Sequence, residues 1–528
     1  MKFLKLEELT TRQKLGMLLC ARSFERNCPE DGEDLEFVLD MIRNHALGCV
    51  QVPIGRADIM EKVRAAADYP IIIIADMEMG YPKSKLPPVP MMALSACNRK
   101  ECYQAFARSI VTDAKRAGYN GMWGPVIDVL ISDGPCKVYR DFSDDPMEVA
   151  KAAEEIARIF ANNHFLSCGK HYPGGDFGGI DTHMANVASA STKEDLLNTT
   201  LVPYFHLLEK GLLPTIMSGH GTHLDVDPDY PASLSKKTID LIRDRGFDGV
   251  CFTDSLAMMA ILQKYGEENV LGMAVAAGND IVLPNYRTSN RKNYEMLVKN
   301  YEDGAFTEER LNEAVRRVLA AQEYVGTEPE QPDLMGEGDE ENYYAVARDC
   351  ITAVTDPGVD AALPADNTDR LFVIVGDKSD VEAGKVKGEA IARNWYCPDL
   401  IEQRIQEDFP EAEIAWLPEY ADASDNDRVL VAATRHKEVV VVCYCTTRPY
   451  LGTDCMTRRA EAMINALIYS GKVSAVVHFG NPFAQQPIKH VPRRLFGYMM
   501  PQSQEYAIDV LAGKLPAKGR LPFKVELP

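Results

Sequence analysis

The densest group of chemically useful side chains runs from Lys170 to His183. Lys170 and His171 follow an apolar stretch, and both can hydrogen-bond the hydroxyl groups of a ligand. A loop with four glycines then leads to Asp181 and His183. In an extended segment these two side chains point the same way, so the carboxylate can hold the imidazole as a general acid and base near neutral pH. The alternative is a surface loop in which Asp181 caps a helix.

A second aspartate, Asp254, directly follows the apolar stretch 250–253. A carboxylate in this position is either the nucleophile of covalent catalysis or the cap of the next helix. Asp76 ends another apolar run, and Arg140 lies in a segment that also contains several aspartates. Their side chains suit the recognition of sugar hydroxyls, although caps or surface ion pairs would use the same residues.

The elements that must position these residues form a repeating pattern as far as Tyr324. Short apolar runs alternate with amphipathic stretches of helical length, which predicts a parallel α/β sheet. We predict strands at 47–52, 71–76, 121–128, 165–171, 213–220, 249–254 and 280–283. We predict helices at 100–117, 146–163, 193–209, 236–245 and 307–324. About seven or eight such units predict closure into a (β/α)8 TIM-like barrel.

Most of the predicted strands end in an ionisable residue, namely Asp76, Asp128, His171, His220 or Asp254. Active sites of parallel α/β barrels lie at the carboxyl ends of the strands. We therefore expect these side chains to converge on one pocket.

The domain organisation follows from a change in composition after residue 325. Residues 326–345 are rich in proline, glycine and acids, which predicts a linker between a catalytic barrel at 1–325 and a C-terminal domain at 346–528. New apolar runs at 371–376, 439–444, 473–479 and 495–499 predict a smaller open α/β sandwich. No G-x-G-x-x-G follows Gly376, so a nicotinamide cofactor is not expected, and no other cofactor is indicated.

Charge and composition exclude several classes of function. The chain has 528 residues with 46% hydrophobic side chains, and its formal net charge is −21. We expect no binding to nucleic acid or to an anionic membrane, because phosphate recognition needs a basic surface. Residues 1–9 lack the apolar core of a signal peptide, and the 13 cysteines are scattered, with Cys168, Cys251 and Cys443 in apolar runs. Reduced, buried thiols in the cytoplasm are the prediction.

Taken together, these motifs resemble glycoside hydrolase family three, in its β-N-acetylglucosaminidase (β-hexosaminidase) branch of two-domain type. The loop from Lys170 to Gly174 that ends in Asp181-Thr182-His183 matches the family pattern K-H-[FY]-P-G…D-[ST]-H. Segment 246–258 matches the nucleophile motif, 76–80 matches D-x-E-x-G, and 140–146 matches R-x-F-x-x-D-P. The chain departs from the family at 175–178, at Tyr81-Pro82 and at Ser255.

The resemblance implies a role for each candidate residue. Asp254 is the expected nucleophile, and Asp181 and His183 form the expected acid/base pair. The residues expected to hold the terminal sugar are Asp76, Arg140, Lys170, His171 and Met258. The expected partner is a small β-N-acetylhexosaminide, cleaved with retention through a glycosyl-aspartate. The oligomeric state stays open, a homodimer included.

Three alternatives stay open beside the hydrolase. Phosphate can replace water as acceptor, because a histidine repels that anion less than a glutamate does, and another β-glycosidase of the family is compatible with the same motifs. A metal-dependent barrel amidohydrolase would bind zinc through residues such as His171, His183, His220, His223 and Asp254, but no early H-x-H pair supports a metal site. A non-catalytic sugar-binding protein would not need both Asp254 and His183.

Overall fold

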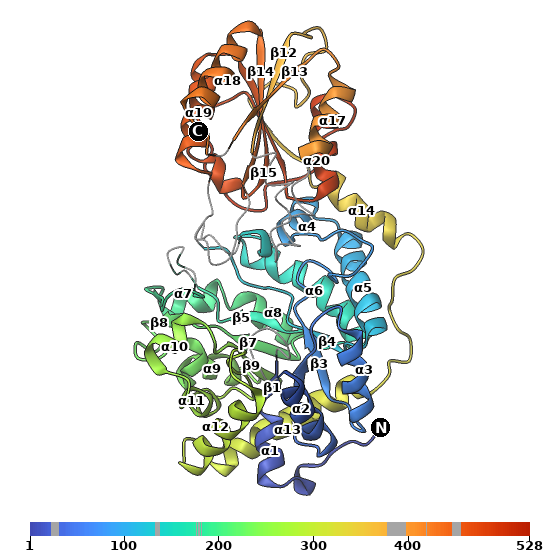
Figure 1. Ribbon diagram of the computed structural model, residues 1–528, viewed down its shortest axis with the longest axis vertical. Helices are drawn as coiled ribbons and strands as arrows, with labels where there is room; N and C mark the ends of the chain where they lie inside the picture. Colours follow the sequence, from blue (N-terminus) through green and yellow to red (C-terminus); the bar gives the residue numbers. More distant parts are fainter. Residues whose placement is uncertain are drawn as a thin grey trace. The chain divides into compact units, whose positions relative to one another are not determined.

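The computed structural model describes residues 1–22, 31–131, 138–175, 177, 180, 182–376, 398–418, 420–445 and 456–528. The chain forms two compact units (Figure 1). The first comprises Met1–Lys85, Gln104–Ser132 and Asp145–Gly336, and the second comprises Leu86–Tyr103, Asp133–Asp144 and Glu337–Pro528. Residues 327–338, inside the predicted linker, contain no helix or strand.

The first unit is built on a ring of eight parallel strands. These are β1 (Cys20–Ala21), β2 (Cys49–Gln51), β3 (Ile72–Ala75), β4 (Gly121–Met122), β5 (Gly169–Tyr172), β7 (Thr215–Ser218), β9 (Val250–Ser255) and β10 (Ile281–Leu283). They pair in the orders β1-β2-β3-β4 and β10-β9-β7-β5. Parallel bridges Leu19↔Val282, Gly121↔Leu166 and Val126↔Lys170 join the two sheets into one ring. The predicted TIM-like barrel is confirmed, with β1 as a strand that the sequence patterns did not indicate.

Helices lie outside this ring, as Figure 1 shows for α8, α9 and α11. The helices of the chain up to residue 326 are α1 (Thr11–Met17), α2 (Asp31–Arg43), α3 (Ala57–Ala66), α4 (Met91–Cys97), α5 (Lys100–Ala117), α6 (Pro146–Asn162), α7 (Lys193–Asn198), α8 (Val202–Glu209), α9 (Lys236–Arg243), α10 (Met259–Tyr265), α11 (Val270–Ala277), α12 (Asn290–Glu302) and α13 (Glu308–Gly326), with 3₁₀ turns η1 (Leu6–Glu8), η2 (Val138–Arg140) and η3 (Ala232–Leu234). The short strands β6 (Ala188–Ser189) and β8 (Thr222–His223) pair with each other outside the ring.

Local sequence explains where these helices begin. Asp145 caps α6 by accepting hydrogen bonds from the N–H groups of Met147 (2.8 Å) and Glu148 (3.1 Å), and Pro146 occupies the first turn. The predicted helix 193–209 is wrong as one element, because the chain breaks at 199–201 between α7 and α8. Pro203 in the first turn of α8 has no N–H to continue the hydrogen-bond ladder of α7.

The second unit holds a six-stranded sheet in the order β11-β16-β15-β14-β12-β13. Its strands are β11 (Thr352–Thr355), β12 (Arg370–Val375), β13 (Glu413–Leu417), β14 (Glu438–Cys445), β15 (Val473–Gly480) and β16 (Arg493–Gly497), and all neighbours are parallel except β11 and β16. Besides α4 and η2, which belong to this unit, its described helices are α14 (Asp339–Asp349), α17 (Pro398–Asp408), α18 (Ala423–Arg435), α19 (Arg458–Tyr469) and α20 (Pro501–Leu511), with the 3₁₀ turn η4 (Pro482–Gln485). The predicted open α/β domain is confirmed.

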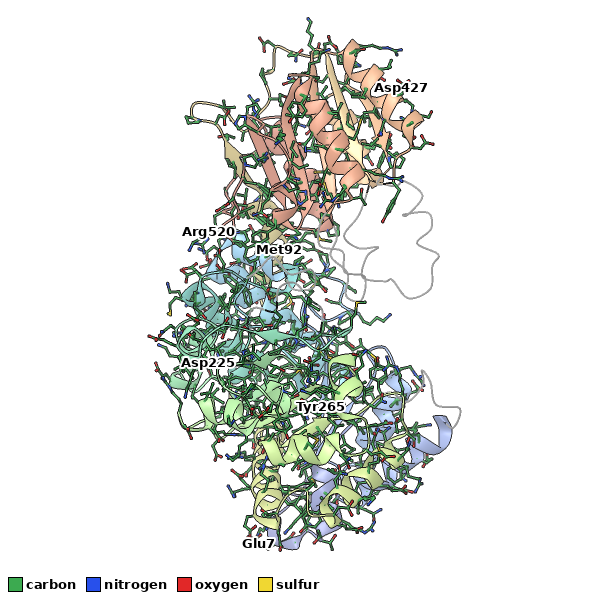
Figure 2. The ribbon with its side chains drawn as sticks, turned by 90° about the vertical axis from the view of Figure 1, so that its left-hand side faces the viewer. Glu7, Met92, Asp225, Tyr265, Asp427 and Arg520 are labelled. Atoms are coloured by element: carbon green, nitrogen blue, oxygen red, sulfur yellow. The ribbon has the colours of Figure 1, made fainter. Side chains whose placement is uncertain are left out.

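Helices cover both faces of this sheet, with α18 and α19 on one side and α17 and α20 on the other (Figure 1). Alternate residues of β12, such as Leu371 and Val373, pack in one core with Val429 of α18 and Ile464 of α19. In Figure 2, Asp427 of α18 projects from the outer side of the helix, whereas Val429 is buried. This amphipathic spacing places α18 on the sheet.

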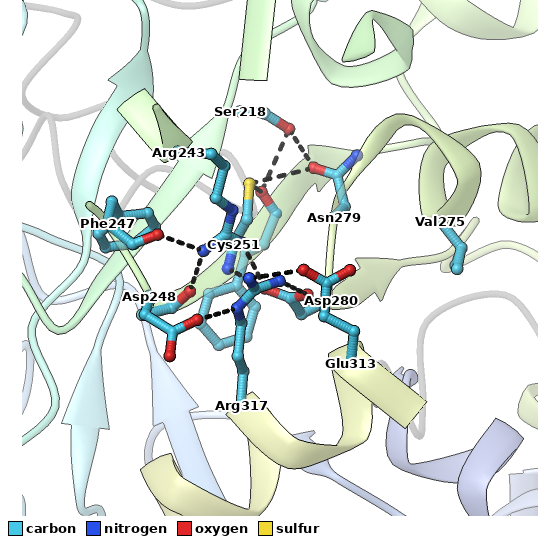
Figure 3. A network of polar contacts seen from close by, with 12 residues as sticks. Ser218, Arg243, Phe247, Asp248, Cys251, Val275, Asn279, Asp280, Glu313 and Arg317 are labelled. Atoms are coloured by element: carbon cyan, nitrogen blue, oxygen red, sulfur yellow. Dashed lines mark hydrogen bonds and ion pairs between the residues drawn. The ribbon is translucent and has the colours of Figure 1, made fainter. Parts of the chain in front are cut away.

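A charged network closes the amino end of the barrel between β9 and β10 (Figure 3). Asp280 is fully buried and accepts from the guanidinium groups of Arg243 (2.7 Å), Arg310 (2.7 Å) and Arg317 (3.3 Å). It also accepts from the backbone N–H of Cys251 at 2.9 Å. One carboxylate therefore ties α9 and α13 to two adjacent strands, at the end of the barrel opposite to the carboxyl ends of the strands.

Two further expectations concern thiols and membranes. The cysteines named above, Cys168, Cys251 and Cys443, are buried and free, as predicted. Burial raises the pKa of Cys168 to about 12, mainly through desolvation of the thiolate. Within the described ranges, none of the helices has the length and apolarity needed to cross a membrane.

Candidate active site

Lys170 forms a buried ion-pair cluster at the carboxyl ends of β3 and β5. Its ammonium group lies 2.9 Å from Asp76 and 2.5 Å from Glu78, and its side chain is 3% exposed. The attraction between the lysine and the two carboxylates offsets the free energy that is lost when these charges are removed from water. Asp76, which is 56% exposed, keeps surface for a ligand. The two predicted binding residues, Asp76 and Lys170, are thus brought together, and Glu78 joins them.

His171 is held from one side by Asp128. The Nδ1 atom of the ring lies 2.8 Å from Asp128 Oδ2, and the backbone N–H of His171 donates to Asp128 Oδ1 at 3.0 Å. Asp128 is almost fully buried. A carboxylate that accepts from Nδ1–H fixes the tautomer and orientation of an imidazole.

Asp254 lies in β9, partly exposed at the carboxyl end of the strand. Burial by itself would raise the pKa of Asp254, but the charges of His171, His220 and His183 and a hydrogen bond from the N–H of Ser255 outweigh it and lower the pKa to about 2. The Ser255 N–H lies 2.6 Å from Asp254 Oδ1. Asp254 is therefore ionised at neutral pH, as a nucleophile must be.

His220 supports the segment that carries Asp254. Its Nε2 lies 2.9 Å from the carbonyl oxygen of Ser255, and its Nδ1 lies 2.8 Å from Ser233 Oγ. Desolvation lowers the pKa of this buried histidine, against the charge of Asp254, which raises it. On the other side, the guanidinium of Arg22 donates to Ser255 Oγ at 2.9 Å and to Gln51 Oε1 at 2.9 Å.

His183 lies beside the start of α10, which follows the Asp254 strand. The carbonyl oxygen of His183 accepts from the N–H of Met259 at 3.3 Å, and that of Thr182 accepts from Ala260 at 3.4 Å. The side chain of His183 acts electrostatically on Asp254. Met258 is buried directly before α10. Asp181, the predicted partner of His183, lies outside the described residues.

Phe177 anchors the loop that leads to His183. Its ring packs edge-on against His223, with ring centroids 5.6 Å apart. It also fills the space next to Gly221, where a Cβ atom would lie 2.1 Å from Phe177 Cζ. Because only glycine leaves this space open, Gly221 allows the ring of Phe177 to lie against the backbone at this position.

Most residues of this cluster were predicted from the sequence, whereas the supporting roles of their neighbours were not. Asp76, Lys170, His171, His183 and Asp254 all belong to the first unit. Arg140 ends η2 in the second unit, so its binding role stays a prediction.

Glu78, Asp128 and His220 were noted in the sequence as motif or strand-end residues without an assigned role, and Arg22 was missed. The first three had a usable signal, since each lies at the end of an apolar run or in a matched motif, whereas Arg22 follows a strand of two residues.

Among the residues that the structure describes, no group of three or more His, Cys, Asp or Glu side chains has an arrangement that would hold a metal ion. His171 and His220 instead use ring nitrogens on Asp128, Ser233 and Ser255.

Comparisons with known proteins find similar glycoside hydrolases. The family model described as the N-terminal domain of glycosyl hydrolase family 3 matches residues 11–321. A β-N-acetylglucosaminidase/β-glucosidase of Cellulomonas fimi is 25% identical over 344 residues, or 61% of this chain and 59% of that protein. A β-hexosaminidase of Neisseria meningitidis is 30% identical over 178 residues, or 33% of this chain and 49% of that protein.

Among solved structures, a family 3 β-N-acetylglucosaminidase from Paenibacillus sp. has a TM-score of 0.78 at 23% identity, over 98% of this chain and 100% of that chain. This likeness shows a shared fold over both units. The two sequence relatives are matched over less than two thirds of their own lengths.

Proposed function

Since that family model covers more than half of its length, the chain belongs to glycosyl hydrolase family 3, and from this premise we propose that it is a retaining β-N-acetylhexosaminidase. It removes terminal β-linked N-acetylglucosamine through a covalent glycosyl-aspartate. The names of the sequence relatives support this substrate class. The observation that carries the proposal is Asp254, a carboxylate kept ionised at the carboxyl end of β9 by surrounding histidines.

In the proposed mechanism Asp254 attacks the anomeric carbon while His183 protonates the departing oxygen. Asp181 orients His183 and stabilises its charged form. The neutral imidazole then takes a proton from water, which releases the sugar with retained configuration. Asp76, Lys170, His171, Arg140 and Met258 hold the sugar in the meantime.

A direct test combines turnover with stereochemistry. The protein should release N-acetylglucosamine from aryl β-N-acetylglucosaminides, and NMR of the first product should show the β-anomer. A first-formed α-anomer would contradict the retaining mechanism, and preference for another β-glycoside would contradict the substrate class.

Phosphorolysis is the second candidate reaction. The histidines around Asp254 are compatible with a phosphate acceptor. Three histidines act on Asp254, and the proposed proton carrier is itself a histidine, so no acidic acid/base residue would repel a phosphate acceptor. The same assay with inorganic phosphate distinguishes the two reactions. A sugar 1-phosphate product, with a rate that saturates in phosphate, would identify a phosphorylase.

A further inference from the structure

Asp128 makes a two-point contact that the proposed mechanism does not use. One carboxylate oxygen accepts from the backbone N–H of His171 at 3.0 Å, and the other lies 2.8 Å from the ring Nδ1 of the same residue. The side chains of Asp128 and His171 are 3% and 18% exposed. A contact that engages both the backbone and the ring leaves the imidazole little rotational freedom.

The surrounding backbone holds this contact in place. The N–H of Ile127 donates to the carbonyl oxygen of Lys170 at 2.8 Å, which joins the residue before Asp128 to the residue before His171. Gly174 passes close by with a φ of +79°, and a Cβ at that position would lie 3.5 Å from Asp128 Oδ1. The carboxylate is thus enclosed, and replacement by asparagine changes its charge without leaving a void.

The occupied Nδ1 atom determines what His171 presents to the pocket. Nε2 lies on the far side of the ring from Asp128, and the charge of His171 is the largest of the contributions that lower the pKa of Asp254. The ionisable groups that act on His171 or Asp254 are Asp128, His183 and His220, and Lys170, the neighbour of His171 in the chain, pairs with Asp76. Of these, Asp128 is the one hydrogen-bonded to the His171 ring in the contacts above.

We propose that Asp128 is a positioning residue, which fixes the ring of His171 so that its positive charge faces Asp254. The proposal rests on the role of Asp254 as nucleophile. Asp128 does not touch the substrate in this account and acts only through His171. Its function is to keep the nucleophile ionised while the sugar binds above it.

The first test reads the ring directly and needs no turnover. In wild-type protein labelled with ¹⁵N-histidine, the Nδ1 signal of His171 should have the shift of a protonated nitrogen. In Asp128→Asn, the amide oxygen keeps the backbone hydrogen bond and the amide NH₂ faces Nδ1, so the signal should move to the unprotonated range. His171→Gln assigns the signal. An unchanged Nδ1 signal in Asp128→Asn would overturn the proposal.

The second test uses the acid limb of kcat/KM. Asp254 attacks only when ionised, so activity falls as the pH drops through its pKa. Loss of the facing charge raises that pKa, and Asp128→Asn should therefore move the acid limb upward by about one to two pH units. Asp303→Asn, which changes an exposed carboxylate directly after α12, is the matched control and should leave the acid limb in place. An equal loss of activity at every pH would contradict the proposal.

A double-mutant cycle separates an effect through His171 from a direct one. If Asp128 acts only through the ring, Asp128→Asn combined with His171→Gln should have the acid limb of His171→Gln alone. A further shift in the double variant would overturn that route. If the wild type cleaves no β-glycoside, the proposed function fails, and the ¹⁵N signal still decides the positioning role.

Discussion

At the scale of single residues, histidines act as counter-charges for Asp254, the proposed nucleophile. Burial opposes the ionisation of Asp254, and His171, His220 and His183 together reverse that effect, with a pKa of about 2 as the result. The lowered pKa means that the carboxylate stays charged from neutral pH down to strongly acidic pH.

His183 should matter most for substrates with poor leaving groups. If it donates the proton, His183→Ala should slow alkyl or sugar glycosides by about 10²–10⁴-fold, and aryl glycosides with acidic phenols far less. Asp181→Asn should show the same contrast more weakly, since the imidazole remains. Steady-state rates over a leaving-group series measure both effects.

Azide provides the control for that series. An aryl substrate of His183→Ala should show a burst followed by slow turnover, which azide accelerates because an anion needs no general base. Equal slowing of all substrates, with no azide effect, would make His183 a binding or structural residue.

At the scale of elements, strand ends and one glycine-rich loop assemble the site. The alternation of apolar runs and helices predicted the barrel and the column of polar strand ends, because both follow from the periodicity of side-chain burial. β1 was not predicted because only two of its residues pair with a neighbouring strand. β13 was not predicted because it lies at the edge of the sheet, where some of its side chains remain exposed. Contacts such as Asp128 with His171 join residues 43 apart, so no local pattern reveals them.

Phe177 should control the rate through the loop that leads to His183. Phe177→Ala removes the packing on Gly221 and His223, and the displaced proton donor should lower kcat/KM for poor leaving groups by about 10-fold or more. Phe3→Ala, the same truncation at a half-exposed site in the first unit, is the control and should leave the rate unchanged. Equal rates for both variants would contradict a positioning role for the loop anchor.

At the scale of the whole molecule, the two ends of the barrel in the first unit carry different clusters of side chains, one proposed for catalysis and one for stability. The ionisable pocket occupies the carboxyl ends of the strands, whereas the Asp280 network fastens their amino ends. The likeness to a solved relative covers 98% of the chain and so includes the second unit. A role of Arg140, which lies in this unit, in sugar binding stays a prediction. Repeated apolar strands identify such a domain without indicating what it binds.

The Asp280 network should be a stability element only. Asp280→Asn leaves three guanidinium groups without their shared buried carboxylate, and loss of one partner of a buried ion pair costs about 3–5 kcal/mol. Thermal unfolding should report a strongly reduced Tm, with kcat/KM unchanged at temperatures where the variant is folded. Asp303→Asn is the surface control. An unchanged Tm for Asp280→Asn would contradict this role.

Trapping the glycosyl-enzyme intermediate shows whether Asp254 is the covalent nucleophile. After incubation with a fluorinated slow substrate, the mass of the protein should increase by one glycosyl group, and peptide mass spectrometry should locate it on Asp254. Asp254→Asn should fold normally, lack turnover and remain unlabelled. A label on another residue, or labelling of Asp254→Asn equal to that of the wild type, would contradict the account.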